Sequence, residues 1–145
     1  MRFFVNFKRL FLSTIIIFVL NLFIGGFSCG FLFKWIYNIP PIVWLPQEEF
    51  LKMSNLFGSL FVGFLKAFFF CVVFAVIYDG VPKQGASKGI IYGILIWLIG
   101  PLVGMGFLAF FMTIAQIVIV YWIFQALVMN IVSGAILGAI YRKKV

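Results

Sequence analysis

The placement of the charged residues constrains the fold of this chain more than any other feature. Eleven basic and three acidic side chains occur among 145 residues, and almost all of them lie at the two ends or in two short interior segments. The stretches between them are long and apolar, and 66% of all residues are hydrophobic. A soluble domain of this length must present nearly half of its residues to water, so the excess apolar surface must face lipid. The sequence therefore predicts an all-α integral membrane protein.

The apolar stretches have the length of membrane crossings. A hydrocarbon core about 30 Å thick is crossed by roughly 20 helical residues. No charge occurs between Gly89 and Tyr141, a stretch that is too long for one crossing, so a turn is expected between Gly100 and Gln116, where Gly100-Pro101 is the first break signal. We predict a single domain in which four transmembrane helices form a compact bundle, over residues 10–33, 56–78, 89–106 and 117–141.

The basic residues predict the orientation in the membrane. They precede the first crossing, follow the last one, and occur between the second and third crossings as Lys83 and Lys88, which we interpret as solvated loop charges. Lys and Arg near the ends of crossings favour the cytoplasmic side. We therefore expect a multi-pass protein of the inner (plasma) membrane with both termini in the cytoplasm. The net charge of +8 then reflects segments that flank crossings and contact anionic headgroups, and no nucleic-acid partner is expected.

The first crossing has an alternative interpretation as a cleaved signal peptide. It begins with basic residues and contains the small residues Gly26, Ser28 and Gly30, and Cys29 raises the possibility of a lipoprotein cleavage site. The apolar stretch is longer than a typical signal core, and the usual branched aliphatic residue before the cysteine is missing. These features favour a retained transmembrane helix.

The first outer segment contains signals for a short interfacial helix. Pro40, Pro41 and Pro46 prevent a continuous helix, and Pro46 is followed by acidic residues that suit a first helical turn. Apolar side chains from Phe50 to Leu56 follow. We expect this helix to lie at the membrane surface, with Trp35, Tyr37 and Trp44 at headgroup depth.

Small residues recur at every fourth position of the predicted helices, which places them on one face of each helix. In lipid, helix association depends on close backbone approach, and small side chains permit it. The pattern predicts that the helices contact one another. The positions expected at these contacts are Gly63, Ala67, Cys71, Gly89, Gly93, Gly134 and Gly138.

Lys66 is the residue that most needs an explanation, because it lies near the middle of the second predicted crossing. A charge at this depth costs on the order of 3 kcal/mol on insertion scales. Asn21, Trp97 and Asn130 fall at similar depth on the other three crossings, and no acidic residue is available at that level. These four residues form the candidate polar site.

Three interpretations of Lys66 remain open. In the first, it is a structural residue that is either bonded to asparagine oxygens or uncharged. In the second, it is the fixed charge of a site for an anion or polar solute. In the third, it is a docking point for another membrane subunit that supplies the missing acid. The sequence contains no histidine, no cysteine spacing typical of a metal site and no phosphate-binding glycine loop. We therefore expect no enzyme activity, no catalytic residues, no metal and no cofactor.

The second half of the chain resembles small four-span bacterial integral membrane proteins of unassigned function. The resemblance rests on Lys88-Gly89-Ile90-Ile91-Tyr92-Gly93, Trp97, Gly100-Pro101, Tyr121-Trp122 and the segment from Gly134 to Tyr141. It implies a four-helix membrane fold and transfers no catalytic residue.

The sequence thus favours a small structural or accessory component of a membrane assembly, whose partners are the lipid bilayer and either further copies of itself or another membrane subunit. The alternative is a passive channel or transporter for an anion or small polar solute, with a midplane site around Lys66.

Overall fold

A computed structural model of the chain describes residues 6–141. This part of the chain is helical and contains no β-strand. It has four helices that are long and apolar enough to cross a membrane, and they run over Phe7–Leu32, Met53–Gly80, Gly85–Phe111 and Gln116–Ile140. The prediction of an all-α fold with four long apolar helices is therefore confirmed.

The first long helix consists of α1 (Phe7–Phe27) and a π-helical turn, Ser28–Leu32. It begins at Asn6, whose side chain accepts a hydrogen bond of 3.3 Å from the backbone N–H of Arg9 and so satisfies one of the free donors of the first turn. A short 3₁₀ helix, Lys34–Asn38, follows and leads into the proline-containing segment.

The interfacial helix that we predicted after Pro46 is a single turn, α2 (Gln47–Phe50). Lys52 leaves the helical conformation and forms an ion pair with Glu49, while the amide of Asn55 donates a 2.7 Å hydrogen bond to the backbone carbonyl of Glu49. These local bonds compete with helix continuation. The next helix, α3 (Met53–Ile77), therefore already includes residues that we expected at the membrane surface, and it ends in a 3₁₀ turn, Tyr78–Gly80.

The third long helix extends five residues beyond the predicted end at Gly106. It comprises α4 (Gly85–Trp97), a π-helical turn (Leu98–Leu102) and α5 (Val103–Phe111). Pro101 has no N–H and clashes with the preceding turn of a regular α-helix, so it was expected to break the helix. The wider π turn accommodates it instead. The connection to α6 (Gln116–Ile140) is short and begins at Met112.

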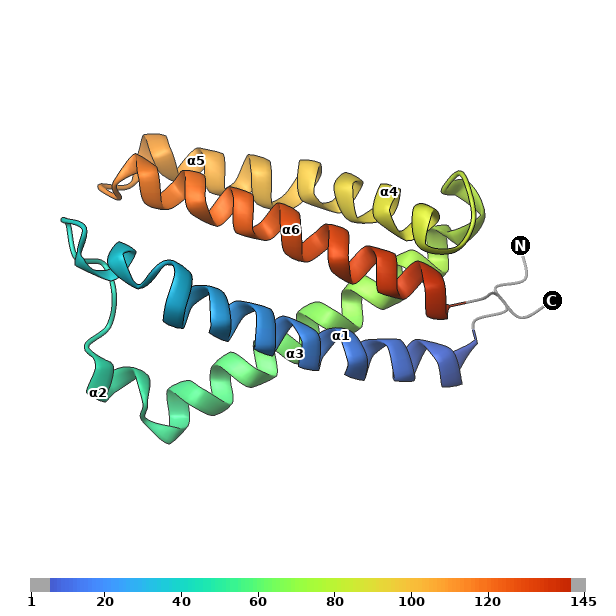
Figure 1. Ribbon diagram of the computed structural model, residues 1–145, viewed down its shortest axis with the longest axis horizontal. Helices are drawn as coiled ribbons and strands as arrows, with labels where there is room; N and C mark the ends of the chain where they lie inside the picture. The colour runs from blue at the N-terminus through green and yellow to red at the C-terminus, as the bar shows by residue number, and fades with distance from the viewer. Residues whose placement is uncertain (1–5, 142–145) are drawn as a thin grey trace.

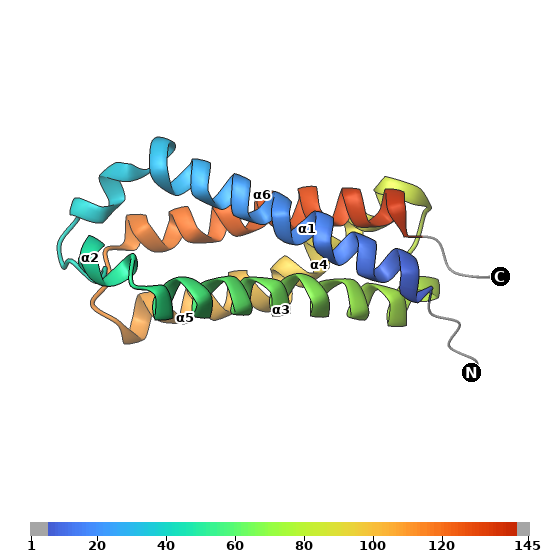
Figure 2. The same ribbon diagram turned by 90° about the horizontal axis from the view of Figure 1, so that it is seen from below.

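The helices form a bundle in which α6 is central (Figure 1). The most extensive contact joins α4 to α6, and α1 packs against both α3 and α6. The beginning of α1, the end of α6 and the connection between α3 and α4 lie together at one end, which we call the terminal end. There the backbone N–H of Asn6 donates to the hydroxyl of Tyr141 over 3.4 Å. The opposite end, the loop end, carries α2 and the α5–α6 turn (Figures 1 and 2).

Glycines bring α4 and α6 into backbone contact. A Cβ added at Gly89 would lie 1.7 Å from the carbonyl oxygen of Gly134, and one added at Gly134 would lie 2.1 Å from that of Gly89. Gly93 and Gly138 have neighbours of the opposite helix within a similar distance. Close approach of this kind is the main source of helix association in lipid.

The predicted packing positions on α3 make a different contact. A Cβ at Gly63 would meet the ring of Phe18 on α1 at 3.5 Å, which is an ordinary van der Waals distance. Ala67 and Cys71 are fully buried. The α1–α3 contact therefore does not exclude a side chain at Gly63, in contrast to the α4–α6 contact.

An aromatic cluster closes the terminal end of the bundle. Phe74 packs against the rings of Tyr92 and Tyr141, and the Tyr92 hydroxyl donates a 2.6 Å hydrogen bond to the carbonyl of Phe70.

The prediction that Lys88 is a solvated loop charge is wrong, because this residue is buried and only 7% exposed. Its ammonium group donates to the backbone carbonyl of Tyr78 over 2.7 Å and lies 4.1 Å from the centre of the Tyr78 ring. Both contacts are favourable because a helix C-terminus and an aromatic face attract cations.

Candidate functional site

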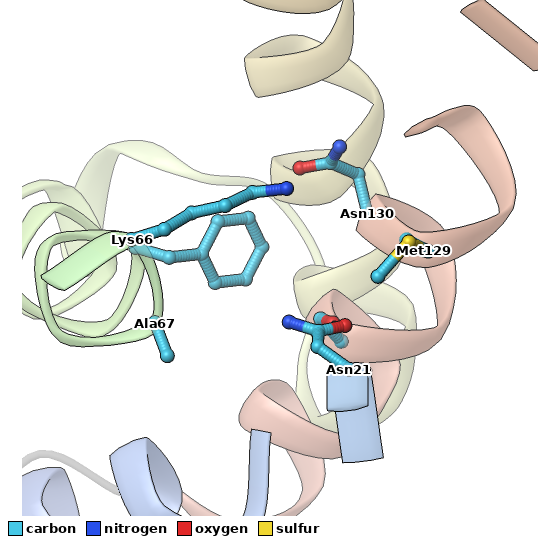
Figure 3. A pocket seen from close by; sticks show the side chains of 7 residues that line it. Asn21, Lys66, Ala67, Met129 and Asn130 are labelled. Atoms are coloured by element: carbon cyan, nitrogen blue, oxygen red, sulfur yellow. The ribbon is translucent and has the colours of Figure 1, made fainter. Parts of the chain in front are cut away.

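Three of the four residues predicted for the polar site lie together between α1, α3 and α6. Asn21, Lys66 and Asn130 line one small pocket (Figure 3), and each lies near the middle of its long helix. The remaining lining residues are Ala67, Phe70, Met129 and Ser133. Each of the three long helices thus contributes polar atoms near its own midpoint.

The amide groups of the pocket are held by specific hydrogen bonds. Asn130 is 4% exposed, and its Nδ2 donates to the carbonyl of Ala126 over 2.7 Å. The hydroxyl of Ser133 donates to Oδ1 of Asn21 over 3.1 Å and so joins α6 to α1. Because Nδ2 of Asn130 is occupied by its own helix, its Oδ1 is left for the pocket, and Figure 3 shows this oxygen turned towards Lys66.

Lys66 extends from α3 across the mouth of the pocket towards Asn130 (Figure 3). Its side chain is exposed at the surface of the bundle. No hydrogen bond or ion pair joins its ammonium group to another residue within the described range. The sequence places no carboxylate on any of the four long apolar helices except Asp79, which lies at the very end of the second.

Lys66 cannot reach the membrane surface along its own helix. It occupies the centre of the 28-residue apolar helix Met53–Gly80, so each end is about 20 Å away at 1.5 Å per residue. This distance is much longer than a lysine side chain. The ammonium group therefore lies at the depth of the hydrocarbon layer, where it needs polar neighbours. An ionisable residue at this depth is a candidate for a functional site.

The pocket is too small for a solute. Its volume is about 10 Å³, which is close to the minimum for a single water molecule. A water there would have the amide of Asn21, Oδ1 of Asn130 and the ammonium of Lys66 as partners. Among residues 6–141, no group of three or more His, Cys, Asp or Glu side chains is placed to hold a metal ion.

Trp97 lies outside this pocket, although the sequence places it at similar depth. Its indole N–H donates a 2.9 Å hydrogen bond to the carbonyl of Ile123, so it joins α4 to α6 instead. Depth along a helix does not fix the direction in which a side chain points. Ser133, which was not among the residues predicted for the site, follows Asn130 by about one turn and therefore shares its helix face.

A second and larger cavity lies between α1 and α6 towards the loop end. It has a volume of about 430 Å³ and is lined mainly by apolar side chains, among them Phe23, Phe27 and Phe124, which are themselves largely exposed. Its main polar groups bond to each other, since Oγ of Ser28 and the hydroxyl of Tyr121 lie 2.9 Å apart. This cavity therefore offers less unsatisfied polarity than the Lys66 pocket.

No protein-family model matches the chain, and no curated protein or solved structure matches it. The resemblance of the second half to small four-span membrane proteins therefore stays a prediction. The candidate site rests on its own geometry.

Proposed function

We propose that this protein is a structural or accessory component of a membrane assembly and that it contacts its partner at Lys66. One observation carries this proposal: Lys66 is an exposed residue at mid-height of the bundle, and its ammonium group has no acidic partner among residues 6–141. A charge at this depth costs on the order of 3 kcal/mol. Contact with a polar or acidic group of another subunit would offset that cost.

The residues around Lys66 support a docking role. Oδ1 of Asn130 and the amide of Asn21 face the same pocket and add hydrogen-bonding capacity beside the ammonium group. Both amides are already fixed by bonds within the bundle, so the site is preorganised. Preorganised polar groups lose little conformational freedom on association.

We further propose that the protein resides in the inner (plasma) membrane with the terminal end of the bundle in the cytoplasm. The first and last described residues, Asn6 and Tyr141, lie in contact at this end. In the sequence, basic residues adjoin the start of α1, the end of α6 and the connection between α3 and α4, which are the segments that meet at this end. The positive-inside rule supports this orientation.

The alternative function is a passive pathway for an anion or small polar solute. The convergence of Lys66, Asn21 and Asn130 on one pocket favours it. The volume of about 10 Å³ counts against it, because a hydrated solute does not fit without rearrangement of the helices. Chloride efflux from liposomes that contain the purified protein distinguishes the two functions, since only a pathway accelerates efflux in a manner that depends on Lys66.

Co-purification tests the accessory function. The tagged protein is extracted from its native membrane in a mild detergent, and the associated proteins are compared between wild type and Lys66→Met. We expect a stoichiometric partner that is lost in Lys66→Met and kept in Lys34→Met, which removes an exposed charge outside the long helices. Identical associated proteins in all three samples contradict the proposal.

A further inference from the structure

We infer that the partner at Lys66 is a transmembrane helix of a different protein that carries a carboxylate near its own midpoint. This inference rests on the proposed function and specifies the chemistry of the contact. It follows from the position of the charge, the shape of the exposed face of α3 and the distribution of acidic residues in the chain.

One exposed face of α3 is open to a second helix. The exposed residues on this face are separated alternately by three and four positions, and they are Ser59, Val62, Lys66, Phe69, Val73 and Val76. Such spacing gives a straight stripe that a second helix follows at a small crossing angle. Lys66 lies in the middle of this stripe, whereas the buried residues of α3, such as Ala67 and Cys71, face the bundle.

A second copy of this chain cannot supply the opposite charge. The chain contains only three acidic residues, Glu48, Glu49 and Asp79. Glu48 and Glu49 lie in α2 at the loop end, and Asp79 lies in the turn that follows α3 at the terminal end. All three are therefore separated from mid-height by about half of the bilayer in either a parallel or an antiparallel pair of copies. An assembly of identical chains leaves every Lys66 without a carboxylate.

Membrane lipids cannot supply it either. Their phosphate and carboxylate groups lie at the headgroups, about 15 Å from the midplane. Lys66 lies about 20 Å from either end of its helix, so only the hydrocarbon tails are available at its level. A carboxylate at this depth must come from a polypeptide that crosses the membrane beside α3.

The site is suited to a carboxylate rather than to an amide or hydroxyl alone. The ammonium group has three donors and a full charge, and the described neighbours contribute one free amide oxygen, that of Asn130. The N–H groups of Asn21 face the same pocket and can donate to a second carboxylate oxygen. A carboxylate that accepts from both Lys66 and the amide of Asn21 would satisfy the ammonium group and its own two oxygens.

A synthetic peptide provides the test. The purified full-length protein carries a donor fluorophore, and an acceptor-labelled Leu–Ala helix of about 20 residues has Glu, Gln or Leu at its centre. Association is measured by energy transfer in phosphatidylcholine vesicles. We expect the Glu peptide to bind on the order of tenfold more tightly than the Leu peptide, which corresponds to about 1.4 kcal/mol. The Gln peptide should fall clearly below the Glu peptide.

Two variants locate the effect. Lys66→Met should remove the preference for the Glu peptide, and Lys66→Glu should instead prefer a peptide with a central Lys. Lys34→Met should behave as wild type. Equal binding of the Glu and Leu peptides to wild type, equal binding of the Glu and Gln peptides, or a Glu preference that persists in Lys66→Met overturns the inference. If the peptides fail this test while native co-purification still depends on Lys66, the accessory function stands and only the carboxylate partner is rejected.

Discussion

Replacing Gly89 by alanine should separate the two most closely packed helices. The new methyl carbon would lie 1.7 Å from the carbonyl oxygen of Gly134, whereas real Cβ contacts essentially never fall below 3.0 Å. The obstacle is backbone and cannot rotate away, so α4 and α6 must move apart by about 1.3 Å at this point. The backbone contacts at Gly93 and Gly138 would loosen with it, because they belong to the same pair of helices.

The expected loss of stability follows from two opposing effects. Overpacking a close contact costs about 1–3 kcal/mol, and the upper part of this range applies because the clash is with a rigid carbonyl. Alanine is favoured over glycine in a helix by about 1 kcal/mol. The free energy of unfolding of Gly89→Ala should therefore fall by about 2 kcal/mol, or roughly thirtyfold in the folding equilibrium constant.

Equilibrium unfolding in mixed micelles measures this change, with sodium dodecyl sulfate as denaturant and tryptophan fluorescence as signal. Trp97 is a suitable reporter because its indole N–H bonds to α6. Gly104→Ala is the matched control, since a Cβ there meets no atom within 4 Å, and it should be unchanged or slightly more stable. If Gly89→Ala is as stable as Gly104→Ala, the backbone contact between α4 and α6 is refuted.

Further predictions concern the terminal end and the orientation. Tyr92→Phe removes the hydroxyl that donates to the carbonyl of Phe70, which keeps its helical bond within α3, so the same unfolding titration should show a loss of about 0.5–1.5 kcal/mol. Lys88→Met removes the hydrogen bond to the Tyr78 carbonyl, and amide hydrogen exchange should accelerate at the end of α3. In a variant without native cysteines, Gly80→Cys and Pro46→Cys should react with a membrane-impermeant maleimide from opposite sides; labelling of both from one side contradicts four crossings.

The small-residue stripes show how far sequence periodicity reaches. Recurrence at every fourth position places such residues on one face of a helix, but it does not identify the helix against which that face packs. The stripe of α4 meets that of α6 with backbone contact at Gly89 and Gly134, whereas Gly63 on α3 has room for a side chain beside Phe18. Which stripes meet depends on how all helices pack together.

The polar residues show a related limit. Distance along the chain gave the depth of Lys66, Asn130 and Trp97, but depth does not give the direction of a side chain around its helix. Lys66 and Asn130 share a pocket, while Trp97 lies outside it and bonds to the carbonyl of Ile123 on α6. Lys88 was assigned to a solvated loop because charges near a crossing usually lie in water, yet the end of α3 offers it a carbonyl and an aromatic face.

The sequence alone determined that this is a helical membrane protein with four long apolar helices and a charge near the middle of the second. It did so because lipid offers no hydrogen bonds to the backbone, which leaves helices of a fixed minimum length as the spanning structure. The tertiary structure decided that the third helix continues through Pro101, that α4 and α6 form the closest pair, and that Lys66 lies beside two amides at a small pocket. These features depend on the rotation of each helix about its axis, which only packing against the other helices selects.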